Sequence, residues 1–126
     1  MTTHILSMTY APKIERVFSG EITQTIRRWW PGKPEKMIGD DLIIHTWEGK
    51  PYRSKWGKRL YAEITYLDII DLTTMTYPEL NELAVLDGID PPTGAELKKV
   101  LWGLNGINFD YQIIRWKPVD DETWIF

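Results

Sequence analysis

Apolar and polar residues alternate along several stretches of this chain, which is the pattern of strands with one buried face. The longest stretch is LYAEITYLDII, residues 60–70, in which Leu60, Ala62 and Ile64 share one side. Because successive side chains of a strand point to opposite faces, this alternation predicts a long strand. Other β-rich runs predict further strands at residues 4–10, 20–30, 41–47 and 109–116.

A different spacing follows the first predicted strand and indicates a short helix. Ile14, Val17 and Phe18 stand at positions i, i+3 and i+4, which places them on one face of a helix. Pro12 lies near the helix start, where proline is tolerated, and Gly20 lies where helices commonly end. We therefore expect a short helix that packs one apolar face on a core.

Capping boxes mark the starts of two more helices. Each box pairs a threonine, whose hydroxyl accepts from the backbone N–H three residues later, with a glutamate at that later position. The two boxes are Thr76 with Glu79 and Thr93 with Glu96. We expect the first helix to run through Leu86 and the second through about Leu104.

The predicted elements follow the order β-α-β-β-β-α-α-β, which lacks the regular alternation of strand and helix found in parallel sheets. We therefore predict an α+β fold in which a curled, mixed or mostly antiparallel sheet is closed by about three helices. The 126 residues contain no internal repeat and no long linker. Residues 1–126 are accordingly expected to form a single domain.

The composition removes several kinds of chemistry. The chain has no cysteine, which excludes disulfides, thiol nucleophiles and thiolate metal sites. Its only histidines, His4 and His45, show no ligand-like spacing with acidic residues, so we expect structural roles for both and neither a metal nor a cofactor. We see no apolar run near the roughly 20 residues of a membrane span and no leader peptide, and we expect a soluble cytoplasmic protein.

Charge is distributed unevenly along the chain, although the whole carries a formal charge of −3. Residues 13–59 hold eleven lysines and arginines against six acids, a net charge of +5. Residues 60–126 hold four bases against twelve acids, a net charge of −8. The basic half favours an anionic partner. The uneven charge is explained equally well by two solvated halves of the chain that attract each other.

The segment GEITQTIRRWW, residues 20–30, carries the most distinctive polar pattern. In an extended chain Thr23, Thr25, Arg27 and Trp29 lie on one face. Two hydroxyls, a guanidinium and an indole in line favour a ligand that is polar, flat or anionic.

Aromatic residues stand beside bases in three segments, RRWW, YRSKWGKR and RWK. Lysine and arginine side chains bind phosphates, and aromatic rings stack on unpaired nucleobases. We expect Trp116 and one of Trp29 or Trp30 to face the core instead. Residues 48–58 are rich in glycine and bases and predict a loop, so a tryptophan there is expected at a binding surface. The candidate ligand-binding residues from these segments are Arg28, Arg53, Lys55, Trp56 and Lys58.

The stretch GEITQTIR resembles the signature of ASCH domains, a branch of the PUA-like superfamily. In that family a helix ends in glycine and the next strand reads roughly G-x-K-T-x-T-x-R, and Gly20, Thr23, Thr25 and Arg27 stand in those places. MIGDDLIIHTW resembles the family's following turn and strand, and ELAVLDGID with ELKKVLWGL resembles its helical pair. The resemblance covers residues 6–117.

The resemblance implies a small PUA-like β-barrel with helices around its ends and a cleft that receives RNA or a nucleoside. Thr23, Thr25 and Arg27 would line that cleft, and the basic 27–59 region would contact phosphates. An alternative is a protein-interaction module in which the loop at residues 48–59 engages an acidic partner.

A further alternative is catalytic, because some ASCH relatives remove the acetyl group from N4-acetylcytidine with a lysine, threonine and glutamate set. By position, the threonine matches Thr25 and the acid aligns with Asp87, while the lysine position holds Ile22. Threonine needs a base to accept its proton, and isoleucine cannot serve as one. Lys13 or Lys33 would have to bring the amine from elsewhere, for which sequence spacing gives no support.

Overall fold

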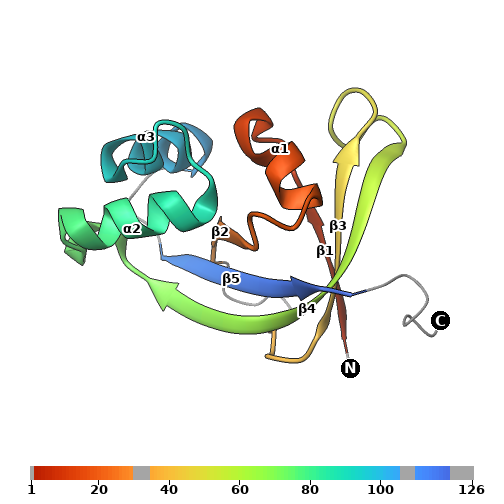
Figure 1. The fold of residues 1–126 in the computed structure, drawn as a ribbon, viewed down its shortest axis with the longest axis horizontal. Coiled ribbons are helices and arrows are strands. Elements are labelled where there is room, and N and C mark those ends of the chain that lie inside the picture. Colours follow the sequence, from red (N-terminus) through yellow and green to blue (C-terminus); the bar gives the residue numbers. More distant parts are fainter. Residues whose placement is uncertain (1, 30–34, 106–109, 120–126) are drawn as a thin grey trace.

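The computed structural model describes residues 2–29, 35–105 and 110–119, and for residues 102–105 the backbone alone. Five strands, three α-helices and one short 3₁₀ helix form the described part of the chain (Figure 1). In chain order they are β1 (Thr3–Ser7), α1 (Ala11–Phe18), β2 (Gln24–Arg28), β3 (Asp41–Trp47), β4 (Trp56–Ile70), η1 (Leu72–Thr74), α2 (Tyr77–Asp87), α3 (Gly94–Asn105) and β5 (Tyr111–Pro118). The predicted order of strands and helices is confirmed.

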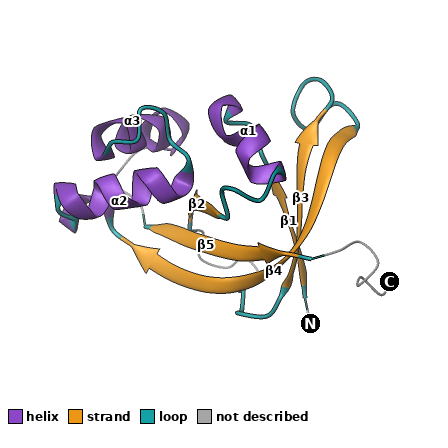
Figure 2. Ribbon diagram, viewed as in Figure 1, coloured by secondary structure: helices purple, strands orange, loops and turns teal. Residues whose placement is uncertain are grey.

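The strands form one mixed sheet in the order β1-β3-β4-β5-β2. β1 pairs with β3 in parallel, and the other neighbours are antiparallel. The 15-residue β4 pairs with β3 and with β5, and its register with β5 shifts between Ile64 and Tyr66. Such an irregularity bends a strand, and β4 and β5 curl together into a half-barrel (Figure 2). The predicted α+β fold, a small curled mixed sheet with about three helices, is confirmed.

The three helices lie on the same side of the curled β4–β5 ribbon (Figure 1). The capping box predicted for α2 is present, since Thr76 Oγ1 accepts from the Glu79 backbone N–H at 3.4 Å and the Glu79 carboxylate accepts from the Thr76 N–H at 3.0 Å. Thr93 Oγ1 likewise accepts from the Glu96 N–H at 3.2 Å. None of the described helices combines the length and the apolar character needed to cross a membrane.

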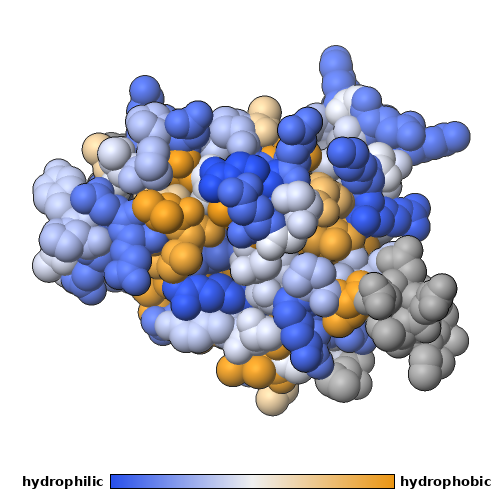
Figure 3. All heavy atoms as spheres, viewed as in Figure 1, coloured by the Kyte–Doolittle hydropathy of each residue, from blue (hydrophilic) through white to orange (hydrophobic). Residues whose placement is uncertain are grey.

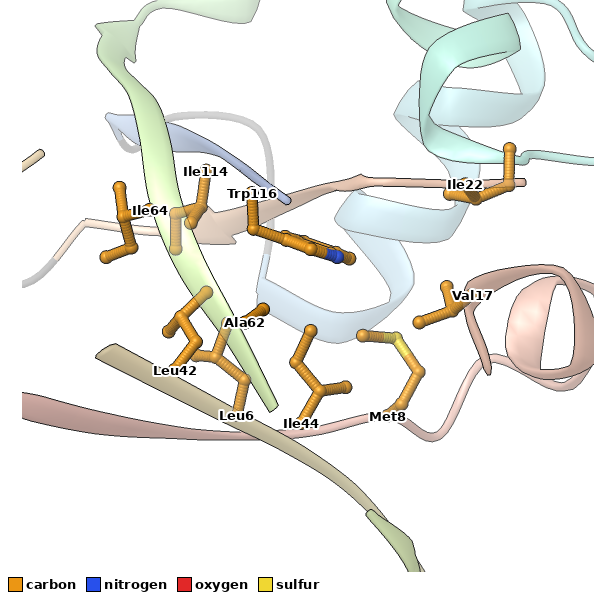
Figure 4. Close-up of a cluster of buried hydrophobic side chains, with 10 residues drawn as sticks. All are labelled: Leu6, Met8, Val17, Ile22, Leu42, Ile44, Ala62, Ile64, Ile114 and Trp116. Carbon is orange, nitrogen blue, oxygen red and sulfur yellow. The ribbon is translucent and has the colours of Figure 1, made fainter. Parts of the chain in front are cut away.

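Two apolar clusters hold the helices on the sheet. The first packs α1 against the inner face of β1, β3 and β4 and contains Trp116, which confirms the prediction that this tryptophan faces the core (Figure 4). The second packs α2 and α3 against β2 and β5. β2 and the turn before it contribute to both clusters, through Ile22 to the first and Ile26 to the second. The segment that carries the candidate site is therefore fixed from two sides.

Several element boundaries differ from the sequence predictions, among them that of the first strand, predicted at residues 4–10, since β1 ends at Ser7. The predicted strand at residues 20–30 is shorter, because β2 spans Gln24–Arg28 and the N–H of Ile22 instead donates to the Arg16 carbonyl at 3.0 Å. The predicted loop at residues 48–58 is also shorter, because β4 already begins at Trp56. Bases and glycines gave this segment a loop-like composition, but its pairing with β3 continues to Trp47.

Candidate active site

A lysine side chain lies buried between α1, β2 and the end of α2. Lys13 shares the inward face of α1 with Val17, one turn later, and is 3% exposed. Its Nζ lies 3.1 Å from Asp87 Oδ2 and donates to Thr25 Oγ1 at 3.4 Å. A third contact, also at 3.4 Å, goes to the Gln24 carbonyl oxygen. The ammonium thus joins three separate elements at one point.

Asp87 reaches this point because α2 ends there. It is the last residue of α2 and is 4% exposed, and Gly88 follows in the left-handed conformation with φ of 73°. A Cβ on Gly88 would come within 3.1 Å of Lys13 Cβ and of Ile22 Cγ1. Glycine at this position therefore permits both the turn and the close approach of α2 to α1. A carboxylate at a helix C-terminus is disfavoured by the helix dipole, and here Lys13 provides the compensating charge.

Thr25 and Arg27 lie together on β2, as their alternation in the sequence suggested. Thr25 is 3% exposed, and its hydroxyl oxygen accepts from Arg27 Nε at 3.3 Å. Arg27 is partly exposed, and its Nη2 donates to the carbonyl oxygen of Ser7. Since β1 and β2 are the two edges of the sheet, this contact links the edges. Thr23 lies before β2 and contributes its carbonyl, which accepts from the Trp116 N–H at 3.1 Å.

Burial shifts the pKa values of the charged pair in opposite directions. Desolvation lowers the pKa of Lys13, against the attraction of Asp87, and nearby Arg27 lowers it further. Desolvation raises the pKa of Asp87, against the effects of Lys13, Gln24 and Arg27. Both shifts favour the neutral forms. A lysine with a lowered pKa gives up its proton more readily than a free lysine, and a neutral amine can accept the proton of a hydroxyl.

The amine comes from a position that the family signature does not indicate. Ile22, at the signature's lysine position, is 4% exposed and belongs to the core around α1 (Figure 4). Lys13 supplies the ammonium from the preceding helix instead, and Lys33 lies outside the described residues. One signal in the sequence could have identified Lys13. It stands one helical turn before Val17, on the face that an amphipathic helix turns toward the core.

Four rings form an aromatic cluster beside Arg27: His45, Trp47, Tyr52 and Trp56. Trp56 stacks on His45 with centroids 3.9 Å apart, and Trp47 meets His45 edge-on at 4.7 Å. Tyr52 is 82% exposed and tilts against Trp47 at 5.2 Å. His45 is the register partner of Ser7, whose carbonyl accepts from Arg27. Burial lowers the pKa of Arg27, against the effects of Asp87 and Tyr52, which raise it.

The other predicted ligand-binding residues surround this cluster. Trp56 is partly buried in β4, where its ring stacks on His45 and its centroid lies 4.9 Å from the Arg59 guanidinium carbon. Arg53, Lys55 and Lys58 are exposed on or beside the β3–β4 hairpin, where hydrophilic side chains gather (Figure 3). Arg28 is partly buried at the end of β2.

The histidines and acids of the described residues form no group of three or more that could hold a metal ion. His4 Nε2 lies 2.8 Å from Asp40 Oδ2, and the same carboxylate oxygen accepts from the Met37 N–H at 3.0 Å. His45 Nδ1 donates to the Thr46 carbonyl at 3.0 Å. These contacts fix a turn and a strand.

Fold and site together define a small α+β half-barrel with a buried lysine, threonine and aspartate at the junction of two helices and an edge strand. No protein-family model and no curated protein matches the sequence. Among solved structures, the ASCH domain from Lactobacillus crispatus JV V101 superposes with a TM-score of 0.67 at 11% identity, over 93% of this chain and 79% of that one. The hypothetical protein PH0355 superposes with a TM-score of 0.61 at 15% identity, over 94% of this chain and 100% of that one. The chain thus has the ASCH-domain fold.

Proposed function

We propose that this protein is an amidohydrolase that removes an acyl group from the exocyclic amine of a nucleobase, with Thr25 as nucleophile. One observation carries the proposal: the buried Lys13 Nζ lies 3.4 Å from Thr25 Oγ1 and 3.1 Å from Asp87 Oδ2. A hydroxyl, a nearby amine with a lowered pKa and a group that orients the amine are the parts of an activated nucleophile. Some ASCH relatives catalyse a reaction of this type, the removal of the acetyl group from N4-acetylcytidine.

The roles of the residues follow from these positions. The neutral amine of Lys13 accepts the Thr25 proton while Oγ1 attacks the amide carbonyl carbon, and the carbonyl π electrons move to its oxygen. Arg27, which donates to Thr25 Oγ1 at 3.3 Å, is placed to stabilise that oxyanion. The Lys13 ammonium then protonates the leaving nitrogen as the C–N bond breaks, which frees the amine and leaves an ester on Thr25. Water, deprotonated by Lys13, hydrolyses the ester to the free acid and restores the hydroxyl.

A planar group beside the amide suits the surroundings of Arg27. The exposed Tyr52 ring packs on Trp47, and the Trp47 Nε1 donor is buried with no hydrogen-bond partner among the described residues. A nucleobase offers a π-face for the first and acceptor atoms for the second. These features support an acylated base over an acylated aliphatic amine.

Incubation with N4-acetylcytidine and chromatographic measurement of cytidine tests the proposal. We expect release by the native protein and loss of about 10³-fold or more in kcat for Thr25→Ala. Thr25→Ser should keep part of the activity because it retains the hydroxyl, and Thr23→Ala is the matched control and should stay within a few-fold of the native protein. No cytidine above the blank, or equal release by Thr25→Ala, would overturn the assignment.

A second candidate function is the binding of single-stranded RNA. It is favoured by three exposed basic side chains near the aromatic cluster, those of Arg53, Lys55 and Lys58. It predicts affinity that falls steeply with salt, because each neutralised phosphate releases counterions. Fluorescence anisotropy with a labelled oligonucleotide at low and high salt measures this. Binding that is absent or independent of salt removes the candidate. Cross-links in lysate that survive ribonuclease would favour a protein partner of the same loop.

A further inference from the structure

A buried glutamine connects the candidate active site to the neighbouring strand β5. Gln24 is 2% exposed, and its Nε2 donates at 3.4 Å both to Asp87 Oδ1 and to the Leu83 carbonyl. Its Oε1 accepts from Arg115 Nε at 2.8 Å. The amide has one possible orientation here, because carboxylate and carbonyl oxygens only accept and a guanidinium only donates.

The two oxygens of Asp87 are thereby given different partners. Oδ1 accepts from Gln24 and Oδ2 faces Lys13. A carboxylate held on one oxygen cannot rotate about its terminal bond without losing that contact. Gln24 therefore fixes the direction in which Asp87 presents its other oxygen to the amine.

Arg115 in turn fixes Gln24 from the neighbouring strand. The two residues are register partners in the β2–β5 pair. The Arg115 guanidinium lies 4.5 Å from the centroid of the Tyr66 ring, and both residues line a cavity of about 430 Å³ between β4 and α2. Acids also line that cavity, among them Asp68 and Glu82.

We propose that Gln24 is a positioning residue for Asp87 and that Arg115 positions Gln24, so that this chain of contacts sets the orientation and protonation of the Lys13–Asp87 pair. The inference rests on the proposed function for its kinetic consequences. Its physical content, the control of the pair's titration, does not depend on any activity.

Gln24→Met keeps the size of the side chain and removes its N–H donors. The ionised form of Asp87 then loses a hydrogen bond, so the acidic limb of the pH–rate profile for N4-acetylcytidine should move to higher pH by about half to one unit. We expect kcat to fall about tenfold with KM within about twofold of the native value. Arg115→Met removes the contact that holds Gln24 at the partly exposed end of this chain of contacts. It should shift the acidic limb in the same direction by a smaller amount.

Lys117→Met is the matched control, because Lys117 lies two residues further on β5 and pairs with Glu63 at the surface. It should leave kcat and the profile unchanged. Native-like circular dichroism of each variant is required, and if Gln24→Met does not fold, Arg115→Met decides the question. A folded variant with an unaltered pH profile overturns the inference.

A second readout separates this inference from the proposed function. In protein labelled with ¹³C at lysine Cε, the Lys13 signal, assigned by its absence in Lys13→Arg, is followed as a function of pH. A changed titration of Lys13 in Gln24→Met supports the positioning role even if N4-acetylcytidine is not a substrate. An unchanged titration contradicts it even if the native protein is active.

Discussion

Lys13 Nζ lies 3.4 Å from Thr25 Oγ1, although the two residues belong to a helix and to an edge strand separated by the Gly20 turn. The contact exists because α1 turns a charged residue toward the core, and because Asp87 at the end of α2 meets that charge at 3.1 Å. Burial of such a pair costs desolvation free energy that its mutual attraction repays only partly. The proposed catalytic role therefore accounts for this buried pair better than a contribution to the stability of the fold does.

Replacing the pair by apolar residues should therefore not destabilise the fold. We expect the double variant Lys13→Met with Asp87→Leu to be as stable as the native protein at neutral pH, or more stable by about 1–4 kcal/mol, and to be inactive. Lys13→Met alone leaves the Asp87 carboxyl buried without its cation and should cost about 3–5 kcal/mol. Urea denaturation followed by tryptophan fluorescence measures both, and a double variant less stable than Lys13→Met alone would contradict this expectation.

The advantage of the double variant should depend on pH. Asp87 has a pKa raised above its ordinary 3.8, so the native fold loses stability as pH rises from that ordinary value to the raised one. Lys13 has a pKa lowered below its ordinary 10.5, so stability lost at neutral pH returns as pH rises toward that value. The difference in unfolding free energy between double variant and native protein should be largest near neutral pH and smaller at both ends. A difference that is constant with pH would mean that the pair does not titrate as described.

Gly88→Ala tests the close approach of the two helices. The substitution introduces backbone strain at φ of 73° and places a Cβ 3.1 Å from Lys13 Cβ. We expect a loss of about 2 kcal/mol or more, the left-handed penalty plus overpacking, together with reduced kcat. Gly20→Ala is the control, since Gly20 has a φ of 87° but nothing within 4 Å of an added Cβ. It should cost about 1–2 kcal/mol from strain alone and leave kcat unchanged.

Arg27→Met should separate catalysis from binding. If the guanidinium stabilises the oxyanion, kcat for N4-acetylcytidine should fall about 10²–10³-fold, with a smaller change in KM. Steady-state kinetics at saturating substrate measures this. An increase in KM with kcat unchanged would instead assign Arg27 to ground-state binding.

Tyr52→Ala should change KM rather than kcat, the reverse of the effect expected for Arg27→Met. Tyr52 is 82% exposed and lies in the β3–β4 loop against Trp47, so its ring is placed to stack on a base. Loss of stacking worth about 1–3 kcal/mol should raise KM roughly 5- to 150-fold with little change in kcat. Tyr52→Phe should restore the native KM. Tyr77→Ala, an equally simple truncation of an exposed ring on α2, should have no effect.

Periodicity predicted most of the fold because each local signal agreed with the packing it enters. The capping boxes at Thr76 and Thr93 and the buried face containing Val17 are examples in which sequence and structure coincide. Trp56 was predicted in a loop because bases and glycines flank it, but its stacking on His45 within the β3–β4 pair decides its position. Such pairing depends on residues distant in the chain.

The candidate site was predictable in part. Alternation along one strand placed Thr25 beside Arg27, and the resemblance to ASCH domains pointed to Asp87. Lys13 was named only as one of two possible sources of the amine, because the family signature directed attention to Ile22 and no spacing rule brings Lys13 to Thr25. That proximity depends on how α1 packs on β2, and on the absence of a side chain at Gly88.

The contact between Arg27 and the Ser7 carbonyl has a consequence for how sequences of this fold can diverge. The Arg27 guanidinium joins the first strand of the sheet to the last, so a shorter side chain at this position would remove that link between the two edges of the half-barrel. A relative without arginine here would need another donor long enough to span the same gap. A bound molecule that draws the guanidinium away from Ser7 would break the same link, so that ligand binding and the contact between the two edge strands would be coupled.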